Sequence, residues 1–227
     1  MTTEAVLHVI SDRQRHRLPL FDAMLECANA GADVLQIREK KAPAKETYEF
    51  CNDLMAACTN GGSHPSFIIN DRLDIAVALG AHGVHLAQKS LPVPIATSVR
   101  DKFNWHGSIG CSVHSFEEAV EAAKLGADYV TFGHVYASES HRGQPPRGVH
   151  ELARIVEALE IPVIAIGGID RSNILHVLST GCSGIAVIGA VLDQDHPYGA
   201  TISLKEQIVA SSIRPKVAFQ SLKGVVE

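Results

Sequence analysis

Eight short apolar runs recur along this 227-residue chain and alternate with segments of helical spacing. Most of the runs are nearly continuous in apolar residues, which is typical of parallel strands buried on both faces. The predicted strands are Val6–Ile10, Asp33–Ile37, Ser66–Ile69, Gly83–Leu86, Gly107–Cys111, Asp128–Phe132, Pro162–Ile166 and Gly184–Val187. The segments of helical spacing include Phe21–Ala30, Lys45–Thr59, Phe116–Leu125, Val149–Leu159 and Ser172–Thr180.

A short glycine-containing phrase marks the joins from helix to strand. It reads AGAD at Ala30–Asp33, LGAH at Leu79–His82, LGAD at Leu125–Asp128 and TGCS at Thr180–Ser183. Glycine at such a join can adopt the left-handed conformation that ends a helix. Eight strand–helix units predict a single α/β domain over residues 1–227, a TIM (β/α)8 barrel. An open doubly wound sheet is the alternative, but eight evenly spaced units suit closure better.

The end of the chain continues beyond the eighth unit. A helix-like run, Ile202–Ile213, is followed by a polar segment, and we expect a frayed end after about residue 214.

Composition narrows the classes of function. The net charge of −5 argues against a nucleic-acid surface, and no apolar stretch reaches the roughly 20 residues that span a bilayer. The five cysteines are dispersed without a CxxC pair, as expected for reduced thiols in a cytoplasmic protein. The N-terminal sequence shows no signal-peptide pattern. We therefore expect a soluble cytoplasmic protein that binds neither nucleic acid nor membrane.

Polar and glycine residues cluster where the predicted strands end. In a barrel of parallel strands, catalytic groups sit at these carboxyl ends. Gly167-Gly168 and Gly189 follow the seventh and eighth strands, each just before a predicted helix. Backbone N–H groups in these two loops often hold a phosphate, so Gly168 and Gly189 are candidate phosphate ligands. The alternative is that the glycines only make tight turns.

The segment Thr131–Gly148, TFGHVYASESHRGQPPRG, follows the sixth strand. A long loop without apolar periodicity is usually functional or mobile, although a plain surface connection is the alternative.

Four stretches of the chain have a distinctive sequence: QIREK (Gln36–Lys40), INDRLDIAVALGAHGVHLAQ (Ile69–Gln88), GCSVHSFEEAVEAAKLGADYVTFGHV (Gly110–Val135) and IPVIAIGGI (Ile161–Ile169). They resemble the thiamine phosphate synthase superfamily, whose members are TIM barrels. The resemblance spans about residues 5 to 192. It implies one of two activities, a magnesium-dependent synthase or a metal-independent thiazole tautomerase.

Departures from the synthase pattern favour the thiazole tautomerase branch. Asp71 matches one magnesium-binding aspartate, but Ser90 stands where the resemblance implies the second. His134 replaces the proline of a GPIF-type turn, and His141 stands where a lysine would be. The expected activity is therefore a proton shift in a phosphorylated thiazole carboxylate, which makes the ring aromatic, with no metal and no cofactor.

The resemblance also implies roles for the candidate residues. His134 would carry the proton, because a histidine can donate and accept near neutral pH. Arg38 would pair with the substrate carboxylate, although an ion pair with Glu39 is the alternative. Asn70 and Ser112 would orient the ring or the carboxylate. A homodimer is also expected. The rival functions are a true synthase, which joins a pyrimidine diphosphate to a thiazole phosphate, and a non-catalytic ligand-binding regulator.

Overall fold

The computed structural model describes residues 4–15, 17–139 and 143–219, and its centre is a closed barrel of eight parallel strands. Each strand pairs with the next along the chain, and β8 pairs with β1. The strands are β1 (Val6–Ile10), β2 (Val34–Ile37), β3 (Ser66–Asn70), β4 (Gly83–Leu86), β5 (Ser108–Val113), β6 (Tyr129–Gly133), β7 (Val163–Ile166) and β8 (Gly184–Val187). The predicted TIM barrel is confirmed.

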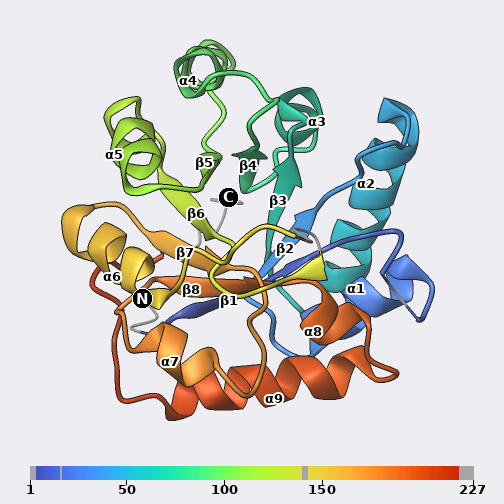
Figure 1. Ribbon diagram of the computed structural model, residues 1–227. Coiled ribbons are helices and arrows are strands. Elements are labelled where there is room, and N and C mark those ends of the chain that lie inside the picture. The colour runs from blue at the N-terminus through green and yellow to red at the C-terminus, as the bar shows by residue number, and fades with distance from the viewer. Residues whose placement is uncertain (1–3, 16, 140–142, 220–227) are drawn as a thin grey trace.

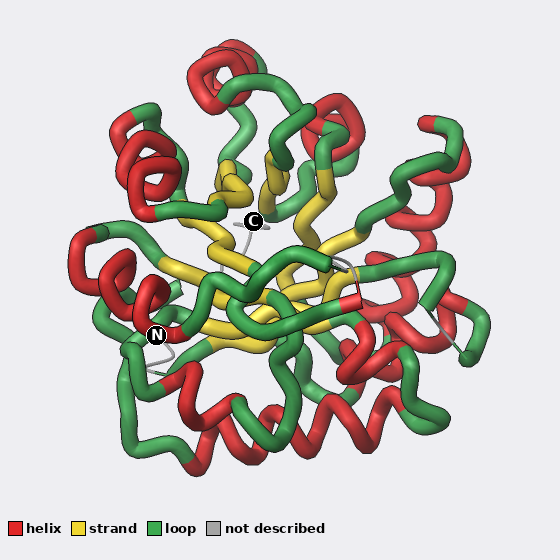
Figure 2. Tube along the Cα trace, viewed as in Figure 1, coloured by secondary structure: helices red, strands yellow, loops and turns green. Residues whose placement is uncertain are grey.

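The helices form a ring around the barrel (Figure 1, Figure 2). They are α1 (Leu20–Asn29), α2 (Ala44–Asn60), α3 (Leu73–Ala78), α4 (Val93–Lys102), α5 (Phe116–Lys124), α6 (Val149–Ala158), α7 (Ile174–Leu178), α8 (Gly189–Leu192) and α9 (Pro197–Ala210). The long helix α9 contacts α1, α7 and α8 along one side of the barrel. Among the described residues, no helix is long and apolar enough to cross a membrane.

The glycines at the helix-to-strand joins adopt the predicted left-handed conformation. Gly31, Gly80, Gly126 and Gly181 have φ of +88°, +59°, +92° and +75°. Any other residue would be strained at these angles, so the repeated phrase marks where each helix turns back to the barrel.

Two layers of apolar side chains hold the barrel together. The larger layer fills the space between strands and helices and includes Leu35, Ile69 and Leu152. A smaller cluster lies inside the barrel and includes Val34, Tyr129, Ile164 and Phe219. The interior is thus a packed core rather than a channel, and the cavity described below lies outside the carboxyl ends of the strands.

The segment after α9 closes the amino-terminal end of the barrel. Phe219 is 6% exposed and packs edge-to-face against the rings of His8 and Tyr129. The Ser183 hydroxyl donates to the Val217 carbonyl at 2.7 Å. The expectation of a frayed end from about residue 214 is therefore wrong for 215–219, and residues 220–227 lie outside the described part.

Candidate functional site

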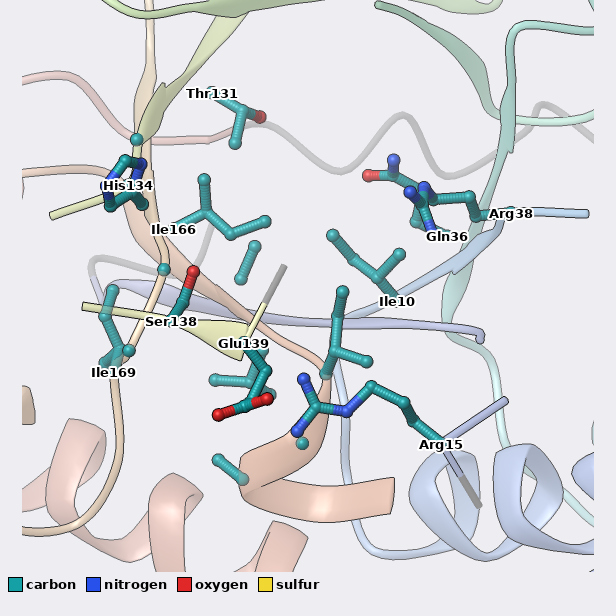
Figure 3. A pocket seen from close by; sticks show the side chains of 18 of the residues that line it. Ile10, Arg15, Gln36, Arg38, Thr131, His134, Ser138, Glu139, Ile166 and Ile169 are labelled. Atoms are coloured by element: carbon teal, nitrogen blue, oxygen red, sulfur yellow. The ribbon is translucent and has the colours of Figure 1, made fainter. Parts of the chain in front are cut away.

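A cavity of about 1460 Å³ opens at the carboxyl ends of the strands. It is lined by every residue that the sequence singled out as catalytic or substrate-binding: Arg38, Asn70, Ser112, His134, Gly168 and Gly189. Gln36 and Arg38 face it from β2 and the segment that follows, and His134 lies on the opposite side (Figure 3). The barrel thus brings together residues that are far apart in the sequence.

Arg38 is held at the carboxyl end of the barrel by residues that directly follow β1. Its backbone N–H donates to Ser11 Oγ at 2.7 Å, and its Nη1 lies 3.5 Å from Asp12 Oδ2. Partial burial lowers the pKa of Arg38, while the carboxylates of Asp12, Asp71 and Glu39 act in the opposite direction. Glu39 forms its ion pair with Arg13, so the alternative of an Arg38–Glu39 pair is not what the structure contains.

Amide side chains at the ends of β2 and β3 form part of the cavity lining. Gln36 Nε2 donates to Asn70 Oδ1 at 2.9 Å, and Asn70 Nδ2 donates to Asp71 Oδ2 at 2.6 Å. Gln36 and Asn70 are both buried. This chain of hydrogen bonds fixes the orientation of the Asn70 amide, because each end of the amide is committed to a partner.

Ser112 is positioned by a buried histidine. His85 Nε2 lies 2.8 Å from Ser112 Oγ, and His85 Nδ1 lies 3.2 Å from the Tyr129 hydroxyl. Burial lowers the pKa of His85 to about 4, so its imidazole is neutral near pH 7. One ring nitrogen of a neutral imidazole donates and the other accepts, which orients the Ser112 hydroxyl.

Thr131, next to Ser112 in the β5–β6 register, also lines the cavity. It is 4% exposed, and its Oγ1 has no hydrogen-bond partner among the described residues. Buried hydroxyls are normally paired, so this group is suited to contact a ligand.

The glycines after β7 and β8 allow close approach of neighbouring segments. Gly167 and Gly168 have φ of +101° and +64°, and a Cβ at Gly168 would collide with the backbone of Ala137. A Cβ at Gly189 would collide with the side chains of Arg15 and Asp193. Packing therefore requires glycine at 168, whereas at 189 only the flexible ends of two side chains would have to move. The backbone N–H groups of Gly168 and Gly189 donate to no other described residue.

His134 is 1% exposed and begins the long loop after β6. Its Nε2 lies 3.4 Å from the Gln144 carbonyl, and its backbone carbonyl accepts from the Arg147 N–H at 2.9 Å. The side chain therefore joins the start of this loop to its end. His141 lies outside the described residues.

Four cationic residues line the cavity in addition to the predicted set, namely Arg15, Lys40, Lys89 and Arg171. Arg15 lies in the loop after β1, faces Glu139 across the cavity (Figure 3) and forms an ion pair with Asp193. Arg15 was not among the residues predicted from the sequence, although the basic run RQRHR is a usable signal. Lys40 and Lys89 line the wall near Arg38.

The residues near Asp71 do not fit the two-carboxylate magnesium site that the family resemblance implies. Asp71 Oδ1 accepts from Ser90 Oγ and from the Ala87 N–H at 3.2 Å, while Oδ2 accepts from Asn70. Ser90 supplies a hydroxyl where a second carboxylate would be needed. In the described ranges, no three His, Cys, Asp or Glu side chains are grouped to hold a metal ion.

Comparison with known proteins places these features in one family. The chain is 38% identical over 200 residues to thiamine-phosphate synthase of Pyrococcus furiosus, covering 88% of this chain and 93% of that protein. It is 40% identical to thiamine-phosphate synthase of Chlorobium luteolum, covering 88% and 91%. The solved structure of thiamine phosphate pyrophosphorylase from Pyrococcus furiosus superposes with a TM-score of 0.81 at 37% identity, covering 90% of this chain and 95% of that one.

These relatives overturn the tautomerase prediction. The expectation of an isomerase rested on Ser90, His134 and His141, whereas the proteins that match over most of the chain are named as synthases. Three positions do not outweigh 38–40% identity over about 200 residues. The proton-carrying role of His134 was predicted for that reaction, and neither the structure nor the relatives test it.

The match extends over nearly the whole barrel. A family model described as thiamine monophosphate synthase covers residues 7–191, from the second residue of β1 to the third residue of α8. The family assignment thus includes all eight strands and every residue predicted to line the cavity. The chain belongs to the thiamine monophosphate synthase family.

Proposed function

We propose that this protein is a transferase that joins a pyrimidine diphosphate to a thiazole phosphate. The thiazole nitrogen forms a bond to the carbon that carries the diphosphate, and the bond from that carbon to the diphosphate oxygen breaks. The bonding electrons leave with the diphosphate, and the thiazole becomes a thiazolium. The similarity over most of the chain to proteins named thiamine-phosphate synthase is the observation that carries this proposal.

The cavity has two regions suited to two anionic groups. Arg38 and Lys40 line one wall, and we assign the diphosphate to it. Gly168 and Gly189 lie on another wall, where their N–H groups are available to the thiazole phosphate. Two substrates held in this way would place the thiazole nitrogen near the reacting carbon, which turns a bimolecular step into one within a complex.

The remaining residues would orient the rings and stabilise the leaving group. Asn70 and Ser112 have their side chains fixed by Gln36 and His85, so they are preorganised to contact the substrate. Arg38 offers several donors to the diphosphate oxygens, on which negative charge increases as the bond breaks. No proton is transferred in this bond exchange, so His134 is assigned to holding the loop after β6.

The test is direct formation of the joined product. The protein is incubated with the two substrates, and phosphorus NMR follows the release of diphosphate while mass spectrometry detects the coupled product. We expect both to appear together at catalytic protein concentrations, in magnesium or in EDTA. Absence of the product in both buffers would refute the proposal. Tight binding of both substrates without turnover would support a ligand-binding regulator instead.

A further inference from the structure

The cavity wall beside β2, β3 and β4 carries an excess of positive charge. Three cations, Arg38, Lys40 and Lys89, line this wall, and one carboxylate, that of Asp71 just after β3, lines it with them. The two lysines are exposed, and neither forms an ion pair with a described residue. Their ammonium groups are therefore available to a ligand.

The three cations are close enough to influence one another. Partial burial lowers the pKa of Lys40 first, and the charges of Arg38 and Lys89 lower it further, against the opposing effects of Asp12 and Asp71. Like charges gathered on one wall repel each other, and an anion bound between them would relieve that repulsion.

Among the described residues, the carboxylates of Asp12 and Asp71 lie beside this wall, and both are already engaged, Asp12 with the Arg38 guanidinium. Both oxygens of Asp71 accept hydrogen bonds, and Ser90 beside it contributes no charge. Magnesium binds through one or two carboxylates together with substrate phosphates, and it requires a nearly ideal octahedron of oxygen atoms. The chemistry of this wall thus favours an anion directly over a metal ion.

We propose that Lys89, together with Lys40 and Arg38, binds the substrate diphosphate directly, so that its binding does not require a divalent cation. Lys89 immediately precedes Ser90, so a positive charge lies next to the position that lacks a carboxylate. Lysine is a compact point charge that suits phosphate oxygens, and Arg38 adds a planar set of donors. The identity of the ligand rests on the proposed function, whereas the charge arrangement does not.

The test is titration calorimetry with inorganic pyrophosphate in EDTA and in magnesium. We expect the Kd of the wild-type protein in EDTA to lie within about threefold of its value in magnesium. Lys89→Ala should weaken binding in EDTA by about tenfold, which corresponds to about 1.4 kcal/mol. The matched control is Lys124→Ala, which removes the same charge at the end of α5, remote from the cavity, and should leave the Kd unchanged.

A second variant restores a carboxylate. Lys89→Ala combined with Ser90→Asp should make pyrophosphate binding at least tenfold tighter in magnesium than in EDTA. Loss of wild-type pyrophosphate binding in EDTA, with recovery in magnesium, would overturn the inference. Equal weakening by Lys89→Ala and Lys124→Ala would also overturn it, because the effect would then be one of net charge.

The outcomes separate this inference from the proposed function. Metal-independent pyrophosphate binding without formation of the coupled product would refute the transferase, but it would still support direct binding of the anion by Arg38, Lys40 and Lys89. Product formation with pyrophosphate binding that strictly requires magnesium would support the transferase and refute direct binding by these three residues.

Discussion

Replacing Thr131 with valine should stabilise the protein while weakening ligand binding. Thr131 is 4% exposed in the lining of the cavity, and its hydroxyl has no partner among the described residues. A buried hydroxyl without a hydrogen bond costs about 1–3 kcal/mol of stability. Valine keeps the shape of the side chain and removes that cost, so we expect the free energy of unfolding to rise by about 1 kcal/mol.

The same substitution removes a hydrogen bond that we expect the ligand to form. A hydrogen bond of this kind contributes about 0.5–1.5 kcal/mol, so binding of thiamine phosphate, the coupled product of the proposed reaction, should weaken by up to about tenfold. A gain in stability with a loss in affinity is the combination that identifies a hydroxyl retained for the ligand. A hydroxyl without such a role would give the gain alone.

Urea unfolding followed by circular dichroism measures the first quantity, and titration calorimetry with thiamine phosphate measures the second. Thr47→Val is the control, because Thr47 is 2% exposed and its Oγ1 donates to the Pro43 carbonyl at 3.1 Å in α2. That variant should lose about 1 kcal/mol of stability and keep full affinity. If Thr131→Val is destabilised like the control and binds normally, the reasoning is wrong.

Three further substitutions test other parts of the structure. Burial, and to a smaller extent the charge of His85, lowers the pKa of His8 from 6.5 to about 3. As the pH falls below 6.5, this histidine is therefore protonated in the unfolded chain but stays neutral in the folded protein. The stability of His8→Leu relative to wild type should therefore be about 2 kcal/mol more favourable at pH 5 than at pH 7, as measured by urea unfolding. An equal stability difference at the two pH values would contradict this prediction. Gly168→Ala places a Cβ against the backbone of the loop after β6 at a φ of +64°, and it should raise the KM for thiazole phosphate more than that for the diphosphate substrate. Phe219→Ala should lower the free energy of unfolding by about 3 kcal/mol, and an unchanged urea midpoint would show that the packing of the 215–219 segment contributes nothing.

The fold could be predicted because its determinants repeat along the sequence. The glycines at four of the helix-to-strand joins are required by backbone sterics, and the apolar runs follow from burial on both faces of the strands. Strand ends shifted by one or two residues, as at β5, where Gly107–Cys111 was predicted and Ser108–Val113 is found. The packing of Phe219 could not be predicted, because a single aromatic residue in a polar tail has no periodic pattern to mark its burial.

The positions of the site residues could also be predicted, since the carboxyl ends of parallel strands must converge on one opening. Their roles could not. His134 is a histidine in a catalytic position by sequence, but the structure places its Nε2 3.4 Å from the Gln144 carbonyl and buries its ring. A side chain that can carry a proton can equally join two parts of a loop, and its surroundings, which the sequence does not contain, decide between these uses.

The binding of an anion depends more on where charges lie in the cavity than on the net charge of the whole protein. The chain carries a net charge of −5, yet the wall formed by Arg38, Lys40 and Lys89 is positive. At physiological ionic strength, charges more than about 8 Å apart in solvent are largely screened from one another, so a bound anion responds mainly to this wall. An acidic protein can therefore hold a highly charged diphosphate, provided that its cations converge where the strands end. The binding of pyrophosphate in EDTA should accordingly weaken as salt is added, whereas a contact made mainly by backbone N–H groups would change less.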